Sequence, residues 1–359
     1  FGTTTSGATY AWGTNSYGQL GLNTASTQTN PAQLSGAWKT IATAGNFSLG
    51  IKTDGTLWAW GQNNAGQLGQ GNYINTSSPV QVGAAASSWT QVSMSDWGGL
   101  ALTTAGTLWA WGKNNVGQLG QGDVINRSSP VQLGTSSWSA VSAGDGFTVA
   151  VRQDNGLFAW GLNTNGVLGQ IDRQHRSSPV QIGLSSWSQV SAGDGSVLAT
   201  DINNLLFSWG LGVSGQVGDG SGLTRSSPVQ IGTSSWSKVG AGGSHVIAIR
   251  SDGRLFAWGL NNAGQLGDFS STNRSSPVQI GTSSWSSISA GAYNTFAKNL
   301  SGNLYAWGQN NYGQLGNGTT STTITSTPVQ VCVGSCASPQ PVWVKIDASN
   351  FYSAALTAD

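Results

Sequence analysis

Leu255-Phe-Ala-Trp-Gly-Leu-Asn-Asn-Ala-Gly-Gln-Leu-Gly267 is the stretch that decides the architecture, because the chain contains seven versions of it. The Trp-Gly pair recurs with successive spacings of 48, 51, 49, 49, 49 and 49 residues. This repeat runs through all 359 residues, so it predicts a single array of one structural unit, whereas the length alone suggests two or three domains. The tryptophans of this series are Trp12, Trp60, Trp111, Trp160, Trp209, Trp258 and Trp307.

One unit, residues 235–281, contains four segments with the pattern of short strands. Residues 235–240 alternate, residues 245–250 form a β-branched run, and residues 254–258 and 275–280 follow after turns. Pro277 suits a strand start or an outer edge, because it has no N–H to donate. Four strands in about 49 residues predict a propeller blade, so the predicted fold is an all-β, seven-bladed β-propeller with four-stranded blades. A β-helix has shorter coils, and a helical solenoid has a 3.6-residue period that is absent here.

The two ends of the chain predict how the ring closes. Residues 341–359 supply the first two strands of a unit and then stop, whereas residues 6–12 open with the missing half. We therefore expect one domain over residues 1–359, closed by a composite blade in which residues 1–36 pair with residues 341–359. Such pairing would also remove two free sheet edges.

A second tryptophan series precedes the first short strand of each unit. Burying one indole removes about 150–250 Å² from water, so we expect both series to hold the blades together by packing. The members of the second series are Trp38, Trp89, Trp138, Trp187, Trp236, Trp285 and Trp343.

The composition limits the classes of function. Only 8% of the residues are charged and the net charge is +1, so neither nucleic acid nor an anionic membrane is an expected partner. No apolar run reaches the 18 or more residues that span a bilayer, which excludes membrane insertion. The chain begins at Phe1, and Met94 is its only methionine, which favours a processed protein or a piece of a longer one.

The two cysteines lie close together as Cys332 and Cys336. A zinc site would need more Cys or His nearby, and the redox motif has two intervening residues where this pair has three. We predict a local disulfide, with two free thiols as the alternative. A disulfide would indicate an oxidising compartment. Together with the low charge, it leads to the prediction of an extracellular location, either as a secreted protein or on the surface of a cell, a phage or another particle.

The repeated pattern Asp-Gly-x-Leu-x-Ala-Trp-Gly-x-Asn-x-x-Gly-Gln-Leu-Gly, followed by Ser-Pro-Val and then Val-x-Ala-Gly, resembles the regulator-of-chromosome-condensation repeat. The resemblance covers essentially the whole chain and implies a seven-bladed propeller. It does not imply one function, because this scaffold serves unrelated tasks. Nucleotide exchange on a small GTPase would need a projecting wedge, and the units here are near minimal length. The plant UV-B photoreceptor of this family uses a Trp-Arg cluster, whose arginines are missing here.

Catalytic chemistry has little support in the sequence. The two histidines are His175, expected to be a solvated loop residue, and His245, expected to be a structural histidine after an Ala-Gly turn. No nucleophile, acid and base converge in the pattern, so we predict no enzyme activity and no cofactor.

A weak candidate site comes from the acidic turns that precede the second strand of several units. Asp145 and Asp194 repeat in Ala-Gly-Asp-Gly, and Asp96 stands at the equivalent place. With Asn46 and Asn350 in two other units, these side chains could ring one mouth of the central channel and form a weak cation or sugar-hydroxyl site. The alternative is turn chemistry, because Asp and Asn cap such turns. No metal site is predicted beyond this candidate.

The sequence favours a non-enzymatic, extracellular or particle-displayed propeller that binds or assembles through its faces. Expected partners are other proteins or copies of itself, and repeated patches would also suit surface glycans. The alternative is an intracellular adaptor or regulator, such as a small-GTPase exchange factor. Specific contacts are expected where the copies differ, in residues 170–176, 210–215 and 331–340. The candidate contact residues are Gln170, Asp172, Arg173, His175, Arg176, Leu211 and Val213.

Overall fold

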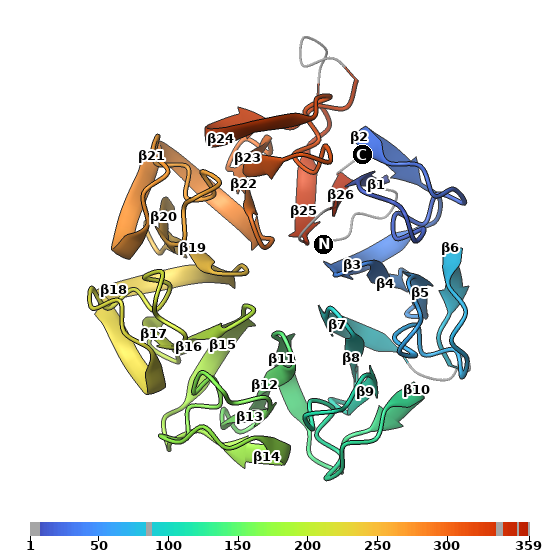
Figure 1. Cartoon of the computed structure of the whole chain (residues 1–359), viewed down its shortest axis with the longest axis vertical. Coiled ribbons are helices and arrows are strands. Elements are labelled where there is room, and N and C mark those ends of the chain that lie inside the picture. The colour runs from blue at the N-terminus through green and yellow to red at the C-terminus, as the bar shows by residue number, and fades with distance from the viewer. Residues whose placement is uncertain (1–7, 84–87, 335–339, 350–351, 358–359) are drawn as a thin grey trace.

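The chain folds into a ring of blades around a central axis (Figure 1). The computed structural model describes residues 8–83, 88–334, 340–349 and 352–357, and these residues form 26 β-strands and no helix. Four sheets have four strands each, and the remaining ten strands form three blades, because β18 and β21 each run from one blade into the next. The predicted all-β, seven-bladed propeller is confirmed.

The first three blades follow one another along the chain. Blade I is β3 (Trp38–Ala44), β4 (Phe47–Lys52), β5 (Leu57–Gly61) and β6 (Thr76–Gln81). Blade II is β7 (Trp89–Ser95), β8 (Gly98–Thr103), β9 (Leu108–Gly112) and β10 (Arg127–Gln132). Blade III is β11 (Trp138–Ala143), β12 (Phe147–Arg152), β13 (Leu157–Gly161) and β14 (Arg176–Gln181).

The next three blades share two long strands. Blade IV is β15 (Trp187–Ala192), β16 (Ser196–Asp201), β17 (Leu205–Gly210) and the first half of β18 (Arg225–Ala241). Blade V continues with the second half of β18, β19 (His245–Arg250), β20 (Arg254–Gly259) and the first half of β21 (Arg274–Ala290). Blade VI ends with β22 (Asn294–Asn299), β23 (Leu304–Asn310) and β24 (Ser321–Gln330).

The closing blade VII combines both ends of the chain. Its strand order is β2 (Gln28–Leu34), β1 (Thr9–Gly13), β26 (Tyr352–Thr357) and β25 (Trp343–Ala348). Strands β1 and β26 pair antiparallel, with Thr9 opposite Leu356 and Gly13 opposite Tyr352. The ring is therefore closed by the pairing of N-terminal with C-terminal strands in a composite blade, as the sequence predicts.

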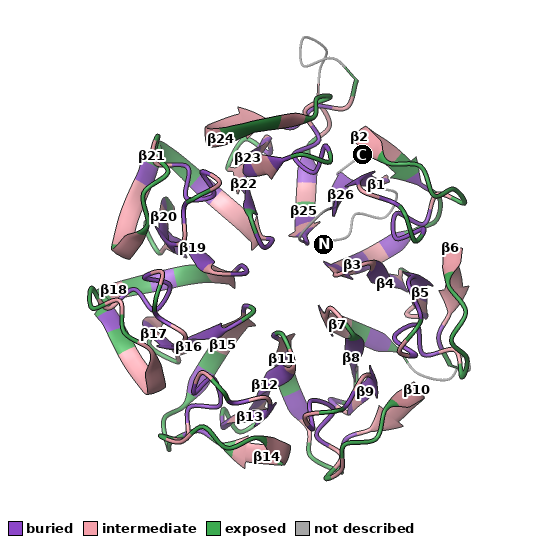
Figure 2. Cartoon of the chain, in the orientation of Figure 1, coloured by how far each residue is buried: buried purple, intermediate pink, exposed green. Residues whose placement is uncertain are grey.

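The core lies between adjacent blades, and the burial pattern follows from it. The second strand of each blade is buried along most of its length, whereas the outer strand is mostly half-buried or exposed (Figure 2). One cluster joins Val149 and Leu157 of blade III to Trp187 and Val197 of blade IV. Apolar burial on both faces of the blade explains why the second strand is a continuous apolar run.

The tryptophans of the Trp-Gly series connect each blade to the preceding one. In every case the indole Nε1 donates a hydrogen bond of 2.8–3.1 Å to a main-chain carbonyl of the preceding blade, in its Gly-Gln-Leu-Gly loop or the equivalent loop. Trp12 closes the circle by donating to the carbonyl of Gln314. These indoles are at most 1% exposed, so each contact combines a hydrogen bond with extensive apolar burial.

The second tryptophan series packs inside its own blade. Trp138, Trp187 and Trp236 meet an aromatic side chain of the third strand edge to face, with ring centroids 5.2–5.5 Å apart. In the closing blade, Trp343 lies 5.9 Å from Tyr10 and 6.1 Å from Trp12. Aromatic packing therefore joins the two ends of the chain.

Candidate functional site

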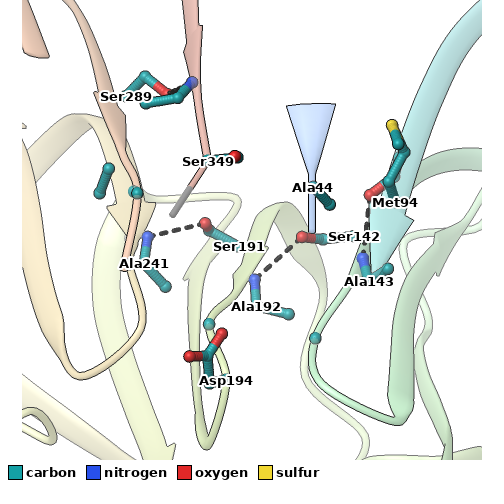
Figure 3. A pocket seen from close by; sticks show the side chains of 18 of the residues that line it. Ala44, Met94, Ser142, Ala143, Ser191, Ala192, Asp194, Ala241, Ser289 and Ser349 are labelled. Carbon is teal, nitrogen blue, oxygen red and sulfur yellow. Dashed lines mark hydrogen bonds between the residues drawn. The ribbon is translucent and has the colours of Figure 1, made fainter. Parts of the chain in front are cut away.

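The ends of the seven inner strands surround one mouth of the central channel and enclose a cavity of about 290 Å³ (Figure 3). Because the first and second strands of each blade are antiparallel, the turns between them all lie on this face. We call it the mouth face. The chain then runs to the opposite face along the second strand and returns along the third. The long loops between third and fourth strands therefore also lie on the mouth face.

Serine side chains in the channel wall join neighbouring blades. Ser142 Oγ accepts a hydrogen bond of 2.9 Å from Ala192 N, and Ser191 Oγ does the same from Ala241 N (Figure 3). Glycine allows the close approach that this needs, because a Cβ added to Gly144 would lie 2.6 Å from the carbonyl oxygen of Gly193. The wall is thus fixed by short contacts between the blades.

Four carboxylates line the cavity: Asp96, Asp145 and Asp194 from consecutive blades, and Asp347 of blade VII. Removal from water, followed by repulsion from Asp96 and Asp145, raises the pKa of Asp194 to about 6. Burial and repulsion from Asp145 likewise raise the pKa of Asp96. No lysine, arginine or histidine is among the described residues that line the cavity, so its titratable lining side chains are all acidic.

The two asparagines of the predicted ring do not join this cluster. The amide of Asn46 bonds to two glutamines instead. It donates a hydrogen bond of 3.2 Å to Gln62 Oε1 of its own blade and accepts one of 3.5 Å from Gln19 Nε2 of blade VII. That part of the prediction is wrong, because Asn46 stands one position later in its turn than Asp145 does. Asn350 lies outside the described residues. Among the residues that the structure describes, no group of three His, Cys, Asp or Glu is arranged to hold a metal ion.

Aromatic side chains stand beside the acidic mouth. Trp97, directly after Asp96, is 37% exposed, and Tyr293 in the equivalent turn of blade VI is 39% exposed. Lys113 Nζ lies 5.0 Å from the centre of the Trp97 ring. Trp97 belongs to neither of the two tryptophan series, so the repeat pattern alone does not indicate its exposed position beside Asp96. Carboxylates beside exposed aromatic rings suit contact with a protein partner.

Both histidines have structural partners. His175 Nδ1 accepts a hydrogen bond of 3.0 Å from the main-chain N–H of Asn163. In blade II, Asn126 Oδ1 accepts the equivalent bond of 2.7 Å from the N–H of Asn114. The ring of His175 is exposed, as predicted. His245 is fully buried, its Nε2 lies 2.7 Å from Thr295 Oγ1, and burial lowers its pKa to about 4. A neutral, buried ring fits the expected structural role.

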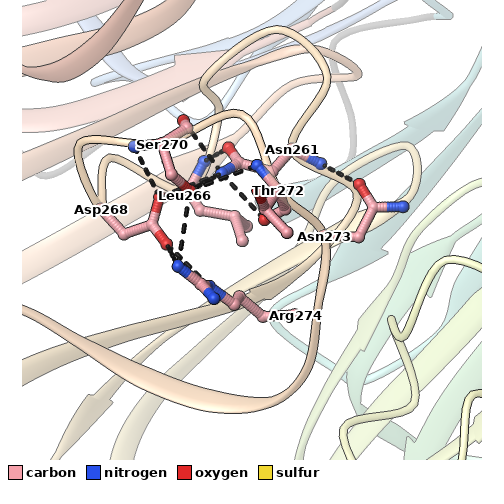
Figure 4. Close-up of polar contacts among 7 residues, drawn as sticks. All are labelled: Asn261, Leu266, Asp268, Ser270, Thr272, Asn273 and Arg274. Atoms are coloured by element: carbon pink, nitrogen blue, oxygen red, sulfur yellow. Dashed lines mark hydrogen bonds and ion pairs between the residues drawn. The ribbon is translucent and has the colours of Figure 1, made fainter.

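The candidate contact loop at residues 170–176 is built on a brace that three neighbouring blades repeat. Asp172 forms an ion pair of 2.6 Å with Arg176. Gln170 Nε2 donates a hydrogen bond of 2.9 Å to the carbonyl of Gln181. Figure 4 shows the equivalent loop of blade V, where Asp268 binds Arg274 and accepts from Asn261 Nδ2 at 3.0 Å. The remaining side chains reach solvent: Arg173 is exposed, Leu211 is half-buried, and Val213 is 72% exposed. Their role as contacts stays a prediction.

The predicted disulfide stays untested. Cys332 is buried with 2% of its surface exposed, and Cys336 lies outside the described residues.

The fold and its clamped blades define a β-propeller built from one tryptophan-bearing repeat. The chain belongs to the regulator of chromosome condensation (RCC1) repeat family, as the resemblance implies. The family profile matches residues 6–51, 54–102, 105–151, 154–200, 203–249, 252–297 and 301–356. A comparison with curated protein sequences finds no match.

Solved structures with the same fold include Prp20p from Saccharomyces cerevisiae, with a TM-score of 0.90 and 20% identity over 100% of this chain and 93% of that chain. That structure is described with its binding to Gsp1p and histones. Yeast RCC1 (Prp20) with Kap60 bound has a TM-score of 0.87 and 19% identity over 98% of this chain and 89% of that chain. Human WBSCR16 gives 0.86 and 19% identity over 99% of each chain.

The predicted extracellular location is wrong. Prp20p binds histones, which are proteins of the cell interior, so this matched propeller works inside the cell. Low charge and a close pair of cysteines also occur in intracellular chains, so neither feature identifies the compartment. No helix among the described residues is long and apolar enough to cross a membrane.

Proposed function

We propose that the chain is a non-enzymatic binding module that docks a protein partner on the mouth face, as an intracellular adaptor or regulator. The observation that carries the proposal is the cavity with Asp96, Asp145 and Asp194 and no cationic side chain among its described lining residues. A lysine or arginine of a partner would relieve the repulsion among these carboxylates, and Trp97 and Tyr293 would supply apolar contact area.

The solved relatives support a protein partner over other ligands. Prp20p binds Gsp1p and histones, and yeast RCC1 was solved with Kap60 bound. Exchange on a small GTPase is the particular regulatory role that the family resemblance suggests for this chain. The near-minimal loops do not favour it over a simple adaptor.

The test measures binding of an octalysine peptide by isothermal titration calorimetry at low salt. The variant Asp145→Asn/Asp194→Asn should bind at least about tenfold more weakly, which corresponds to about 1.4 kcal/mol. The matched control, Asp154→Asn/Asp252→Asn, changes the net charge by the same amount. Its carboxylates lie in turns between second and third strands, at the opposite ends of the blades, so it should bind as the unchanged protein does.

Acidification provides an independent measurement. The carboxylate form of Asp194 attracts the cation, and its pKa is about 6, so the affinity should fall as the pH is lowered from 7.5 to 5.5. Equal affinities for both double variants, or binding that does not depend on pH in this window, would contradict the proposal.

A further inference from the structure

Three further cavities are one cleft repeated at the rim. Each lies between the outer strand of one blade and the face of the next, and we call them the rim clefts of blades II, III and V. Their volumes are about 430, 390 and 520 Å³. Each contains the first-strand tryptophan of its blade, the aromatic residue of the third strand and a Ser-Pro pair of the fourth strand. None of the residues that line them lines the channel cavity.

The floor of each rim cleft is aromatic. Trp89 and Trp109 meet edge to face at 6.1 Å in blade II, as Trp138 and Phe158 do at 5.5 Å in blade III. The third-strand rings are half-buried, so part of each ring faces the cleft. Such a floor favours a ligand that has a flat apolar face.

The walls of the blade II cleft are polar and neutral. The described lining residues are two tryptophans with Gly69, Gln70, Gln81, Gly83, Ser129 and Pro130. Amides and hydroxyls both donate and accept hydrogen bonds, so they match a ligand with several hydroxyl groups. Without a charged side chain among these residues, the cleft offers no particular attraction to anions or cations.

Gln81 lacks the hydrogen bond that the equivalent glutamines of blades II and IV make, as do Gln33 and Gln330 of blades VII and VI among the described residues. The side-chain amides of Gln132 and Gln230 each donate a hydrogen bond of 2.9 Å to the carbonyl of the glycine two residues later. The side chain of Gln81 makes no hydrogen bond with any part of the chain that the structure describes. An uncommitted, half-buried amide is therefore available at the edge of this cleft.

The space above the floor also differs among blades. In blade I, Lys52 Nζ lies 3.5 Å from the centre of the Trp58 ring, and in blades III and V Arg152 and Arg250 lie 4.7 and 4.9 Å from their phenylalanine rings. The equivalent residue of blade II is Thr103, which is too short to cover Trp109. The aromatic floor of blade II is thus the one without a cationic cover among these four blades.

We propose that the rim cleft of blade II binds a neutral pyranose sugar, with its C–H face on Trp109 and its hydroxyls on Gln81 and Ser129. The volume of about 430 Å³ lies in the range of small-molecule sites. Repetition of the frame in blades III and V suits an oligosaccharide or a glycan with several similar rings, because linked contacts raise the overall affinity. The rim site is independent of the mouth face.

The test titrates cellohexaose, maltohexaose and chitohexaose against the whole chain by calorimetry. At least one should bind, and Trp109→Ala should weaken that binding at least about tenfold, or about 1.4 kcal/mol. Trp58→Ala is the matched control, because Trp58 holds the same position in blade I under Lys52, and it should bind within about twofold of the unchanged protein.

Gln81→Leu keeps the test decisive if Trp109→Ala fails to fold, since Gln81 lies at the surface of the fourth strand. One lost hydrogen bond should weaken sugar binding about fivefold. The proposal is overturned if none of the three sugars binds at millimolar concentration, or if Trp58→Ala and Trp109→Ala lose binding equally. It is also overturned if an octaproline peptide binds through Trp109 and the sugars do not, because an aromatic groove can hold a proline-rich segment.

Discussion

Blade VII and blade III share one strand plan, but different side chains join them to the next blade. In blade III the junction uses the neutral Ser142 Oγ, and the second strand starts with the buried apolar Phe147. In blade VII the equivalent positions are Asp347 and Tyr352. Asp347 Oδ2 accepts hydrogen bonds of 2.6 and 2.7 Å from Thr43 N and Oγ1.

Tyr352 adds a second polar contact at the same junction. Its hydroxyl donates to the carbonyl of Phe47 and lies 3.1 Å from Ser48 Oγ. Blade III is covalently continuous with both neighbours, whereas β25 and β26 reach β1 and blade I only through non-covalent contacts. Of these two junctions, the one with charge-assisted hydrogen bonds lies where the peptide chain does not itself close the ring.

Removing residues 1–13 should have the largest effect, because it takes β1 from the middle of the closing sheet. The loss of Trp12 alone would cost about 3–5 kcal/mol. The β1–β26 ladder would be lost as well. We expect no cooperative unfolding transition in differential scanning calorimetry. A truncated chain that keeps the melting temperature of the full chain would show that the closing blade is dispensable.

Asp347→Ala and Ser142→Ala compare the two junctions directly. The first variant removes a charged acceptor and leaves Thr43 N–H unpaired, so the free energy of unfolding should fall by about 2–3 kcal/mol. The second removes a neutral acceptor beside the channel and should cost about 1 kcal/mol. Urea denaturation at pH 7 measures both values, and equal losses would remove the distinction between the junctions.

The pH dependence of stability should come partly from Asp347. Burial raises its pKa to about 6, despite the hydrogen bonds from Thr43, so the folded chain binds a proton more readily than the unfolded chain does. The free energy of unfolding should therefore rise as the pH falls from 7 to about 4.5, by about 1–2 kcal/mol. Asp347→Asn should flatten this dependence, although Asp194 keeps a contribution of the same sign. An unchanged slope would contradict the assignment.

Tyr352→Phe should have the smallest effect, because it gives blade VII the residue type that blade III has. The loss of one buried hydroxyl contact should lower the free energy of unfolding by about 1 kcal/mol. Tyr10→Phe, at a half-buried rim position, is the control and should change it by less than about 0.5 kcal/mol. Thermal unfolding followed by circular dichroism is sufficient, and identical curves for the two variants would contradict the role of Tyr352.

The sequence predicts what repeats and misses what differs. The Trp-Gly spacing predicts seven blades, and the split unit at the two ends predicts the closing blade. Asn46 was placed wrongly because a shift of one residue in a turn sends a side chain elsewhere. The contact between Asp347 and Thr43 spans 304 residues, so no local pattern could indicate it. The rim clefts are assembled from several segments of two blades, and their openness depends on one residue such as Thr103.

The indole clamps have one more consequence. Every acceptor is a main-chain carbonyl. The carbonyl of Val167 accepts the hydrogen bond from Trp209, whereas a glutamine carbonyl accepts it from each of the other indoles. Because each indole bonds only to a main-chain carbonyl, the bond does not depend on the side chains of the neighbouring blade. The order of blades around the ring is therefore not fixed by these contacts. Blades could be exchanged, or the chain circularly permuted at another linker, and every indole hydrogen bond would still form. Such modularity would let the rim and mouth loops vary independently of the frame.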